Sequence, residues 1–220
     1  MNNDKSIYNE TELDQITDQI TDQNKSQTYK NQSDVLIYTI EDVNTYYANC
    51  LRRSMIRDIP VLAIDVVQFE VNTGSLIDEM IAHRLGLVVL NDDNIGDKII
   101  FTLDVTCEKE WMYVTSGMLV SSQDNVYPVH KNIIITKLFR HERIKAKCFV
   151  KKGTGKEHAK WTPVSAIGYK IFNLKDEKML IQLSIESVGG MSPQTILEQG
   201  QKMMGIEKNH LNKFKAGYGK

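Results

Sequence analysis

Three segments of the chain alternate apolar and polar residues with a period of two, and this pattern constrains the fold more than any other feature. They lie at 101–105, 144–150 and 181–185. Successive side chains of a strand point to opposite faces of a sheet, so each segment is predicted to be a strand with one buried face. The run at 65–71 alternates in the same way, and the compact apolar run at 35–40 is also typical of a strand.

A helix is predicted after the first of these strands. Residues 41–42 supply acidic groups at its start, where the helix dipole favours them. Apolar residues then recur at steps of three and four, as they do along one face of a helix. The helix should end by Asp58, because Ile59 precedes Pro60 and is pushed towards an extended conformation.

Two more helices are predicted further along the chain. A short one should cover 78–85, with Gly86 as its left-handed C-terminal cap and a strand over 87–90 beyond it. The last begins at Ser192, a good N-cap, followed by Pro193, which suits the first helical position. Its apolar stripe consists of Ile196, Leu197, Gly200, Met203, Met204, Leu211 and Phe214. Several strands with few helices predict the α+β class.

Composition excludes several classes of protein. The apolar fraction of 41% is enough for a real core, and a net charge of -1 argues against a surface that grips nucleic acid throughout. No apolar run approaches the roughly 20 residues that span a bilayer, so we expect no membrane segment. We also expect no signal peptide. Residues 1–33 are rich in polar side chains and poor in large apolar ones, which predicts a disordered tail.

No pattern of catalytic or metal-binding residues is evident. The three cysteines, Cys50, Cys107 and Cys148, are far apart and form no CxxC pair, so neither a disulfide framework nor a zinc site is expected. The run 153–156 superficially resembles a phosphate loop, but Glu157 follows it where Ser or Thr is required. We therefore expect no catalytic residues, no metal and no cofactor.

Two basic clusters are the remaining candidates for a binding site. Arg52 and Arg53 lie in the middle of the first predicted helix, and arginine is well suited to bidentate contacts at interfaces. A second cluster lies beside Trp161 and consists of Lys151, Lys152, Lys156 and Lys160. Charge alone favours solvated surfaces for both, with nucleic-acid contact as the alternative.

Four blocks of sequence resemble a known family in the order in which that family carries them. They are ANCLRRSMIRDIPVLAID at 48–65, VNTGSLIDEMIAHRLGLVVL at 71–90, KKGTGKEHAKWTP at 151–163 and ESVGGMSP at 186–193. They resemble the third-largest subunit of RNA polymerase II and the archaeal D subunit, which are relatives of the N-terminal domain of bacterial alpha. The resemblance covers roughly residues 35–214.

The resemblance implies an alpha-like dimerisation domain with an inserted, mainly-β second domain. Residues 34–60 and 166–220 would form the first domain, and 61–165 the second. The first and last helices would pack together and against a smaller alpha-like subunit. The residues implied at that interface are Tyr47, Leu51, Met55, Ile196, Leu197, Met203, Met204, Leu211 and Phe214.

Further partners follow from the same resemblance. Arg52 and Arg53 match paired arginines that lie near the second-largest subunit, and Lys156, His158 and Trp161 match a loop between subunits. The chain would be a non-catalytic assembly subunit of DNA-directed RNA polymerase and a platform for the two large catalytic subunits. It would also meet small zinc-binding subunits, and would contact DNA and RNA only through the complex.

Two departures from the family bear on the source. Many eukaryotic relatives carry a Cys-rich zinc loop where this chain has only 91–98 after Leu90, so the zinc is not carried over. The stretch 172–179 is short where RNA polymerase II has a long acidic insertion. This compact form suggests a divergent eukaryote, with a nuclear protein, or a large DNA virus, with a protein of the virion or the host-cell replication site.

Two rival functions differ in class from the polymerase subunit. One is a stand-alone nucleic-acid-binding transcription regulator that uses the two basic clusters, and the other is a hydrolase or transferase with an unrecognised site. The near-neutral charge counts against the first rival, and the absence of any catalytic constellation in the sequence counts against the second.

Overall fold

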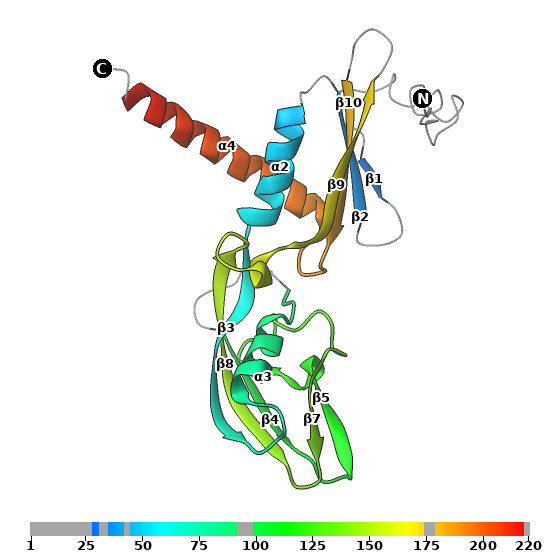
Figure 1. Cartoon of the computed structure of the whole chain (residues 1–220), viewed down its shortest axis with the longest axis vertical. Helices are drawn as coiled ribbons and strands as arrows, with labels where there is room; N and C mark the ends of the chain where they lie inside the picture. Colours follow the sequence, from blue (N-terminus) through cyan, green and yellow to red (C-terminus); the bar gives the residue numbers. More distant parts are fainter. Residues whose placement is uncertain (1–27, 31–34, 42–44, 92–98, 174–178, 218–220) are drawn as a thin grey trace, which may run out of the picture.

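The computed structural model describes residues 28–30, 35–41, 45–91, 99–173 and 179–217. Figure 1 shows an elongated molecule in which a body built on one sheet lies above a second body built on another, with the long strands β3 and β8 rising from the second towards the first. The chain enters the upper body, leaves it for the lower one, and returns.

The upper body consists of one antiparallel sheet and two helices. The strand order is β1-β2-β10-β9. The strands are β1 (Thr28–Lys30), β2 (Val35–Glu41), β9 (Val164–Asn173) and β10 (Met179–Ser187). The helices are α2 (Thr45–Arg57) and α4 (Pro193–Gly217).

The lower body has a second antiparallel sheet with the order β3-β8-β4-β6. Its strands are β3 (Pro60–Asn72), β4 (Ile100–Thr106), β6 (Val120–Ser121) and β8 (Arg143–Thr154). The helix α3 (Asp78–Gly86) and a two-stranded ribbon lie over this sheet, and the ribbon pairs β5 (Trp111–Thr115) with β7 (Ile134–Phe139). Two 3-10 turns lie at Ser116–Met118 and Ala159–Trp161.

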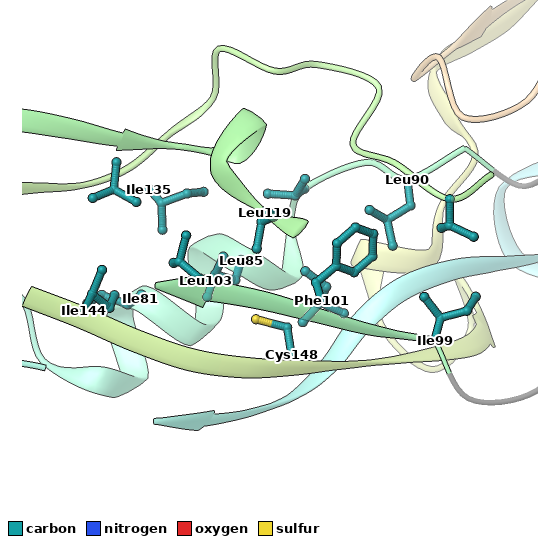
Figure 2. Close-up of a cluster of buried hydrophobic side chains, with 14 of the residues drawn as sticks. Ile81, Leu85, Leu90, Ile99, Phe101, Leu103, Leu119, Ile135, Ile144 and Cys148 are labelled. Carbon is teal, nitrogen blue, oxygen red and sulfur yellow. The ribbon is translucent and has the colours of Figure 1, made fainter. Parts of the chain in front are cut away.

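Each body has its own core. Figure 2 shows the lower core, where Phe101, Leu103, Ile144 and Cys148 point from sheet strands towards α3 and the ribbon. All four are fully buried. Burial raises the pKa of the Cys148 thiol to about 12, so this cysteine stays protonated at neutral pH.

The upper core is formed between the first sheet and the two helices. Its buried members include Leu36, Ile40, Leu51, Met55, Ile59, Val61, Ala63, Trp161, Val164, Leu183, Ile185, Ile196, Leu197 and Met204. Ala63, Trp161 and Val164 thus belong to the upper core although they lie close to the predicted limits of the inserted domain. The boundaries 61–165 themselves stay a prediction.

The predicted class and most of the predicted elements are confirmed. The fold is α+β, and the three alternating segments are β4, β8 and β10. The start of the last helix is also confirmed, because the Thr195 N–H donates to Ser192 Oγ at 3.2 Å and α4 begins at Pro193.

Some local predictions are wrong. Residues 87–90 form no strand, since only Leu90 makes an isolated bridge, to Pro128. Gly86 is not a left-handed cap. Helix α3 ends through the Leu87 N–H, which bonds back to Arg84 O, and Leu87 itself is right-handed with φ -88. A tightened last turn satisfies the terminal carbonyl groups without a positive φ.

Other differences concern the ends of elements and the strands that were not predicted. Strand β1 lies inside the predicted disordered tail and pairs with β2, whereas residues 1–27 lie outside the described residues. The predicted acidic start of the first helix is not confirmed: Glu41 ends β2, α2 begins at Thr45, and 42–44 lie outside the described residues. Strands β5, β7 and β9 were not predicted at all. None of the described helices is long and apolar enough to cross a membrane.

Candidate interaction surfaces

The two helices of the upper body cross at a close contact. Ser54 Oγ donates to the carbonyl oxygen of Gly200 at 3.0 Å. A Cβ atom added at Gly200 would overlap Met55 Cγ, so only glycine allows the helices to approach this closely. The predicted packing of the first helix against the last is therefore confirmed.

The apolar stripe of α4 is covered largely within the chain. Ile196 is fully buried, and Leu197 and Met204 are nearly so. On α2, Leu51 and Met55 have no exposed surface either. These residues are therefore not left for a partner to cover, because α2 and the first sheet close over them and form the upper core.

The remaining members of the predicted dimer interface differ from these. Tyr47 and Met203 are partly exposed, and burial, with Tyr38 as a second cause, raises the pKa of the Tyr47 hydroxyl. The side chains of Leu211 and Phe214 lie outside the described residues. The backbone of α4 continues to Gly217, and in Figure 1 its C-terminal half runs beyond α2 with no other element of the chain beside it.

The opposite side of α2 carries the predicted arginine pair. Arg53 is exposed, and Arg52 is half-buried with its guanidinium donating to Asn49 Oδ1 at 3.0 Å. Tyr46 lies seven residues before Arg53, two helical turns along the same face, and is also exposed. This face lies away from the buried residues of α2, which makes the two arginines available to another chain.

Trp161 anchors the predicted inter-subunit loop to the chain's own core. It is only 4% exposed, and its indole N–H donates to the Lys151 carbonyl at 3.2 Å. The Lys160 ammonium lies 4.3 Å from the ring centroid. Gly153 lies on β8 beneath the ring, and a Cβ atom there would lie 2.5 Å from the indole. Position 153 therefore requires glycine. Trp161 is thus part of the core and offers little area to a partner.

The other two loop residues remain on the surface. Lys156 and His158 are both exposed. The backbone N–H of Lys156 donates to the Arg57 carbonyl at 3.0 Å, and His158 Nδ1 accepts from the Lys160 N–H at 3.1 Å. The backbone of this loop is therefore fixed, the exposed His158 ring is held against it, and the exposed Lys156 side chain extends towards solvent.

The four sequence blocks converge where the two bodies meet. The 151–163 loop bonds to the 48–65 block, because Lys160 Nζ lies 2.7 Å from Asp65 Oδ1. The 186–193 block bonds to the loop through the Val188 N–H and the Pro163 carbonyl at 3.1 Å. It also contacts the 71–90 block, since a Cβ atom on Gly190 would lie 2.6 Å from the Leu90 carbonyl oxygen. The conspicuous motifs therefore fix the two bodies against each other.

One group of exposed apolar residues was missed by sequence reasoning. Ile77, Met80 and Leu87 are all exposed; Met80 lies on α3, and Ile77 and Leu87 flank its two ends. Arg84 lies four residues after Met80, on the same helix face, and donates to the Ile134 carbonyl of β7. The only signal in the sequence was the spacing of these apolar residues, and the same spacing is found on buried helix faces.

Acidic neighbours neutralise much of the basic charge on the lower body. Glu70 lies 2.6 Å from Lys145 and 2.8 Å from Lys147, and these two ammonium groups lower its pKa to about 2. Arg143 makes a bidentate pair with Asp104 at 2.9 Å. In the second predicted basic cluster, Lys160 pairs with Asp65 and Lys151 pairs with Glu157 at 3.6 Å. These pairs weaken both surfaces as phosphate-binding sites.

The described part of the chain contains no group of three His, Cys, Asp or Glu side chains placed to hold a metal ion. Cys50, Cys107 and Cys148 are free thiols. The expectation that no zinc is bound stays a prediction.

Comparison with known proteins places the chain in a family. The family model described as RNA polymerase Rpb3/RpoA insert domain matches residues 67–167. The chain is 36% identical over 185 residues to DNA-directed RNA polymerase II subunit rpb3 of Dictyostelium discoideum, covering 72% of this chain and 61% of that one. It is 34% identical to DNA-directed RNA polymerases II, IV and V subunit 3 of Arabidopsis thaliana, covering 72% and 64%.

An archaeal relative is covered more completely. The chain is 36% identical over 169 residues to DNA-directed RNA polymerase subunit Rpo3 of Methanocaldococcus jannaschii, with 76% of this chain and 82% of that one aligned. The chain spans less than two thirds of the two eukaryotic relatives. The aligned regions include both bodies, and the insert match falls mainly on the lower one. The chain belongs to the Rpb3/Rpo3 family of DNA-directed RNA polymerase subunits.

Proposed function

We propose that this protein is a non-catalytic assembly subunit of a multisubunit DNA-directed RNA polymerase. The observation that carries the proposal is the similarity of both bodies to eukaryotic and archaeal proteins that are named as DNA-directed RNA polymerase subunits. The crossed helices α2 and α4 support it, because they form a rigid base from which the distal half of α4 extends. The stand-alone regulator is disfavoured by the near-neutral net charge of the chain and by the ion pairs that Lys151 and Lys160 of the second basic cluster make with Glu157 and Asp65.

A smaller alpha-like subunit is the proposed partner of the upper body. The contact would use Tyr47, Met203 and the distal half of α4, including Leu211 and Phe214. The buried residues Leu51, Met55 and Ile196 would support that surface from beneath rather than touch the partner, since they have no exposed area. A heterodimer is favoured over a homodimer by the similarity to eukaryotic and archaeal subunits.

Removing residues 206–220 should abolish this pairing while leaving the chain folded. Residues up to 205 contain every described member of the upper core, so thermal unfolding of the truncated chain should stay cooperative. Affinity for the smaller subunit should fall at least about tenfold, because large apolar side chains contribute about 1.5–3 kcal/mol each when fully buried. Co-elution of the two purified subunits in size-exclusion chromatography measures it.

The position of the truncation decides what the experiment tests. Truncation after Gln194 would also remove Ile196, Leu197 and Met204, and would unfold the upper body. Normal pairing by the chain that lacks 206–220 would show that the interface lies elsewhere. A stable, monodisperse homodimer of the full chain in light scattering would contradict the heterodimer.

The arginine face of α2 is the proposed contact with the second-largest subunit. Replacing Arg52 and Arg53 together with alanine should weaken docking onto the large subunits about tenfold, because two donor-rich groups are lost from one exposed face. A pull-down of the large subunits by the preformed small heterodimer measures this. Replacing Lys131 and Arg140, which are exposed on the lower body, is the charge-matched control. Equal recovery with both double variants would argue against the proposal.

The wider assembly follows from the same proposal. The remaining proposed partners are the largest subunit and small zinc-binding subunits. Two exposed groups of side chains are available to contact them: the apolar residues Ile77, Met80 and Leu87, and the loop residues Lys156 and His158. In a cellular eukaryote the site of action would be the nucleus. For a viral protein it would be the virion or the host-cell replication site.

A further inference from the structure

The β5–β7 ribbon presents an aromatic face to solvent. Trp111 and Tyr113 are each 45% exposed, and Phe139 is 46% exposed. Trp111 pairs directly with Phe139 across the ribbon, and the Trp111 and Tyr113 rings meet edge to face at 5.3 Å. The opposite face carries Val114 and Leu138, which are fully buried in the lower core. The inner face of the ribbon is thus packed against the lower core, and the rings on its outer face are not part of that core.

One cation lies over this aromatic face. The ammonium of Lys137 lies 4.5 Å from the centroid of the Trp111 ring and 4.8 Å from that of Phe139. The ion pairs of the described residues include no carboxylate bonded to Lys137. The face therefore combines apolar area with one positive charge that has no acidic partner among these pairs.

The edge of β5 is open along the same residues. Within the described part of the chain, β5 pairs with β7 alone. The Phe139 N–H donates to Glu142 Oε2 and its carbonyl accepts from the Glu142 N–H, so the backbone groups of Phe139 face away from β5 and Trp111–Phe139 is a non-hydrogen-bonded pair. Hydrogen-bonded and non-hydrogen-bonded pairs alternate along antiparallel strands, which turns the backbone groups of Trp111 and Tyr113 towards the open edge. An unpaired edge of this kind is a template for another strand.

We propose that the open edge of β5 binds an extended segment of another protein, one that carries a large apolar and an acidic side chain two residues apart. Its backbone would pair with Trp111 and Tyr113, as in strand addition to other sheet edges. Alternation would place both named side chains of the segment on the aromatic face. The apolar one would pack on the exposed rings, and the carboxylate would reach Lys137.

Charge decides between the possible occupants. A nucleic-acid strand needs several cations along its phosphates, whereas the contacts of the described residues place one ammonium group, that of Lys137, over these rings. Lys137 lies on β7, so two copies joined through their β5 edges would keep both Lys137 side chains on the outer strands and would give neither ammonium group an acidic partner. A protein segment with an apolar and an acidic side chain could pair with the strand edge, pack on the rings and bind the ammonium group at the same time.

A random ten-residue peptide library displayed on phage, selected on the full chain, tests the proposal without any other polymerase subunit. The selected sequences should carry an acidic and a large apolar residue two positions apart. As labelled synthetic peptides, they should bind Lys137→Glu at least about fivefold more weakly than the unchanged chain, because an attraction becomes a repulsion. Failure to select such sequences, or equal binding by Lys137→Glu, would overturn the proposal.

Two substitutions at one position separate the backbone contact from the ring contact. Tyr113→Ala removes the ring and keeps the N–H, whereas Tyr113→Pro also removes the N–H that faces the open edge. Proline is tolerated on edge strands where the N–H faces outward, so the ribbon should stay paired. The proline variant should bind a selected peptide about three- to tenfold more weakly than the alanine variant, as expected for one lost hydrogen bond. Equal binding by the two would contradict strand addition.

Three controls make these results decisive. Unchanged thermal unfolding of Lys137→Glu, Tyr113→Ala and Tyr113→Pro shows that the lower body is intact. If sedimentation detects a dimer that Tyr113→Pro abolishes, the occupant is a second copy and the proposal is wrong. If a labelled 20-nucleotide single strand competes with the peptides and loses affinity for Lys137→Glu, the site binds nucleic acid and the proposal is again wrong.

Discussion

Replacing Trp161 with alanine is expected to lower the free energy of unfolding by about 3–5 kcal/mol, the usual cost of truncating a buried aromatic residue. The indole is 4% exposed, and Gly153 lies directly beneath it. Its N–H bond to the Lys151 carbonyl would also be lost, leaving that acceptor without its partner. Because the loop that carries Trp161 bonds to both α2 and β3, the loss should also loosen the junction between the bodies.

Chemical denaturation followed by circular dichroism measures this effect, and the second tryptophan of the chain is a matched control. Trp111 is 45% exposed on the ribbon, so Trp111→Ala should cost less than about 1 kcal/mol. Equal losses for the two variants would mean that Trp161 is not the anchor of the junction. The comparison also checks that the aromatic face of the ribbon is not part of the core.

Replacing Gly200 with leucine is expected to destabilise the upper body by about 3 kcal/mol. Added atoms in a close-packed contact force neighbouring groups to move, and here the nearest atom is Met55 Cγ on the facing helix. Separation of the helices would also break the bond from Ser54 Oγ to the Gly200 carbonyl. Because the same helix carries the proposed contact with the smaller subunit, pairing should weaken as well.

Gly205 provides the control within the same helix. Nothing lies within 4 Å of a Cβ atom placed there, so leucine would meet no neighbour. Glycine is a poor helix former, and Gly205→Leu should therefore stabilise the chain by about 0.5–1 kcal/mol. Thermal unfolding of the two variants should move in opposite directions. If both move in the same direction, the contact between α2 and α4 does not limit the stability of the upper body.

The elements that could be predicted from the sequence are those in which the local pattern and the burial agree. Strict alternation at 144–150 predicted β8, because Ile144 and Cys148 enter the lower core and Ala146 between them is also fully buried. The Ser192–Pro193 pair predicted the start of α4 from local hydrogen bonding alone. The four motif blocks indicated the family, and the comparisons agree.

Strands such as β5 could not be predicted in this way. Its outer residues Trp111 and Tyr113 are as apolar as the inner ones, so no alternation distinguishes the two faces. Residues 87–90 have the composition of a strand, but no neighbouring strand is available to pair with them beyond the bridge at Leu90. The presence or absence of a partner is a property of the tertiary structure, and a local pattern does not contain it.

The same reason governs the candidate interaction surfaces. Periodicity showed that α4 has an apolar stripe, but the packing of Ile196 and Met204 within the chain depends on where α2 and the first sheet lie in the fold. No sequence pattern indicated that Glu70 forms ion pairs with Lys145 and Lys147, because these residues meet only through the pairing of β3 with β8. The sequence shows which residues share a helix face and which are charged. The residues that pack on that face, or that pair with that charge, lie far away in the sequence and are brought close only by the fold.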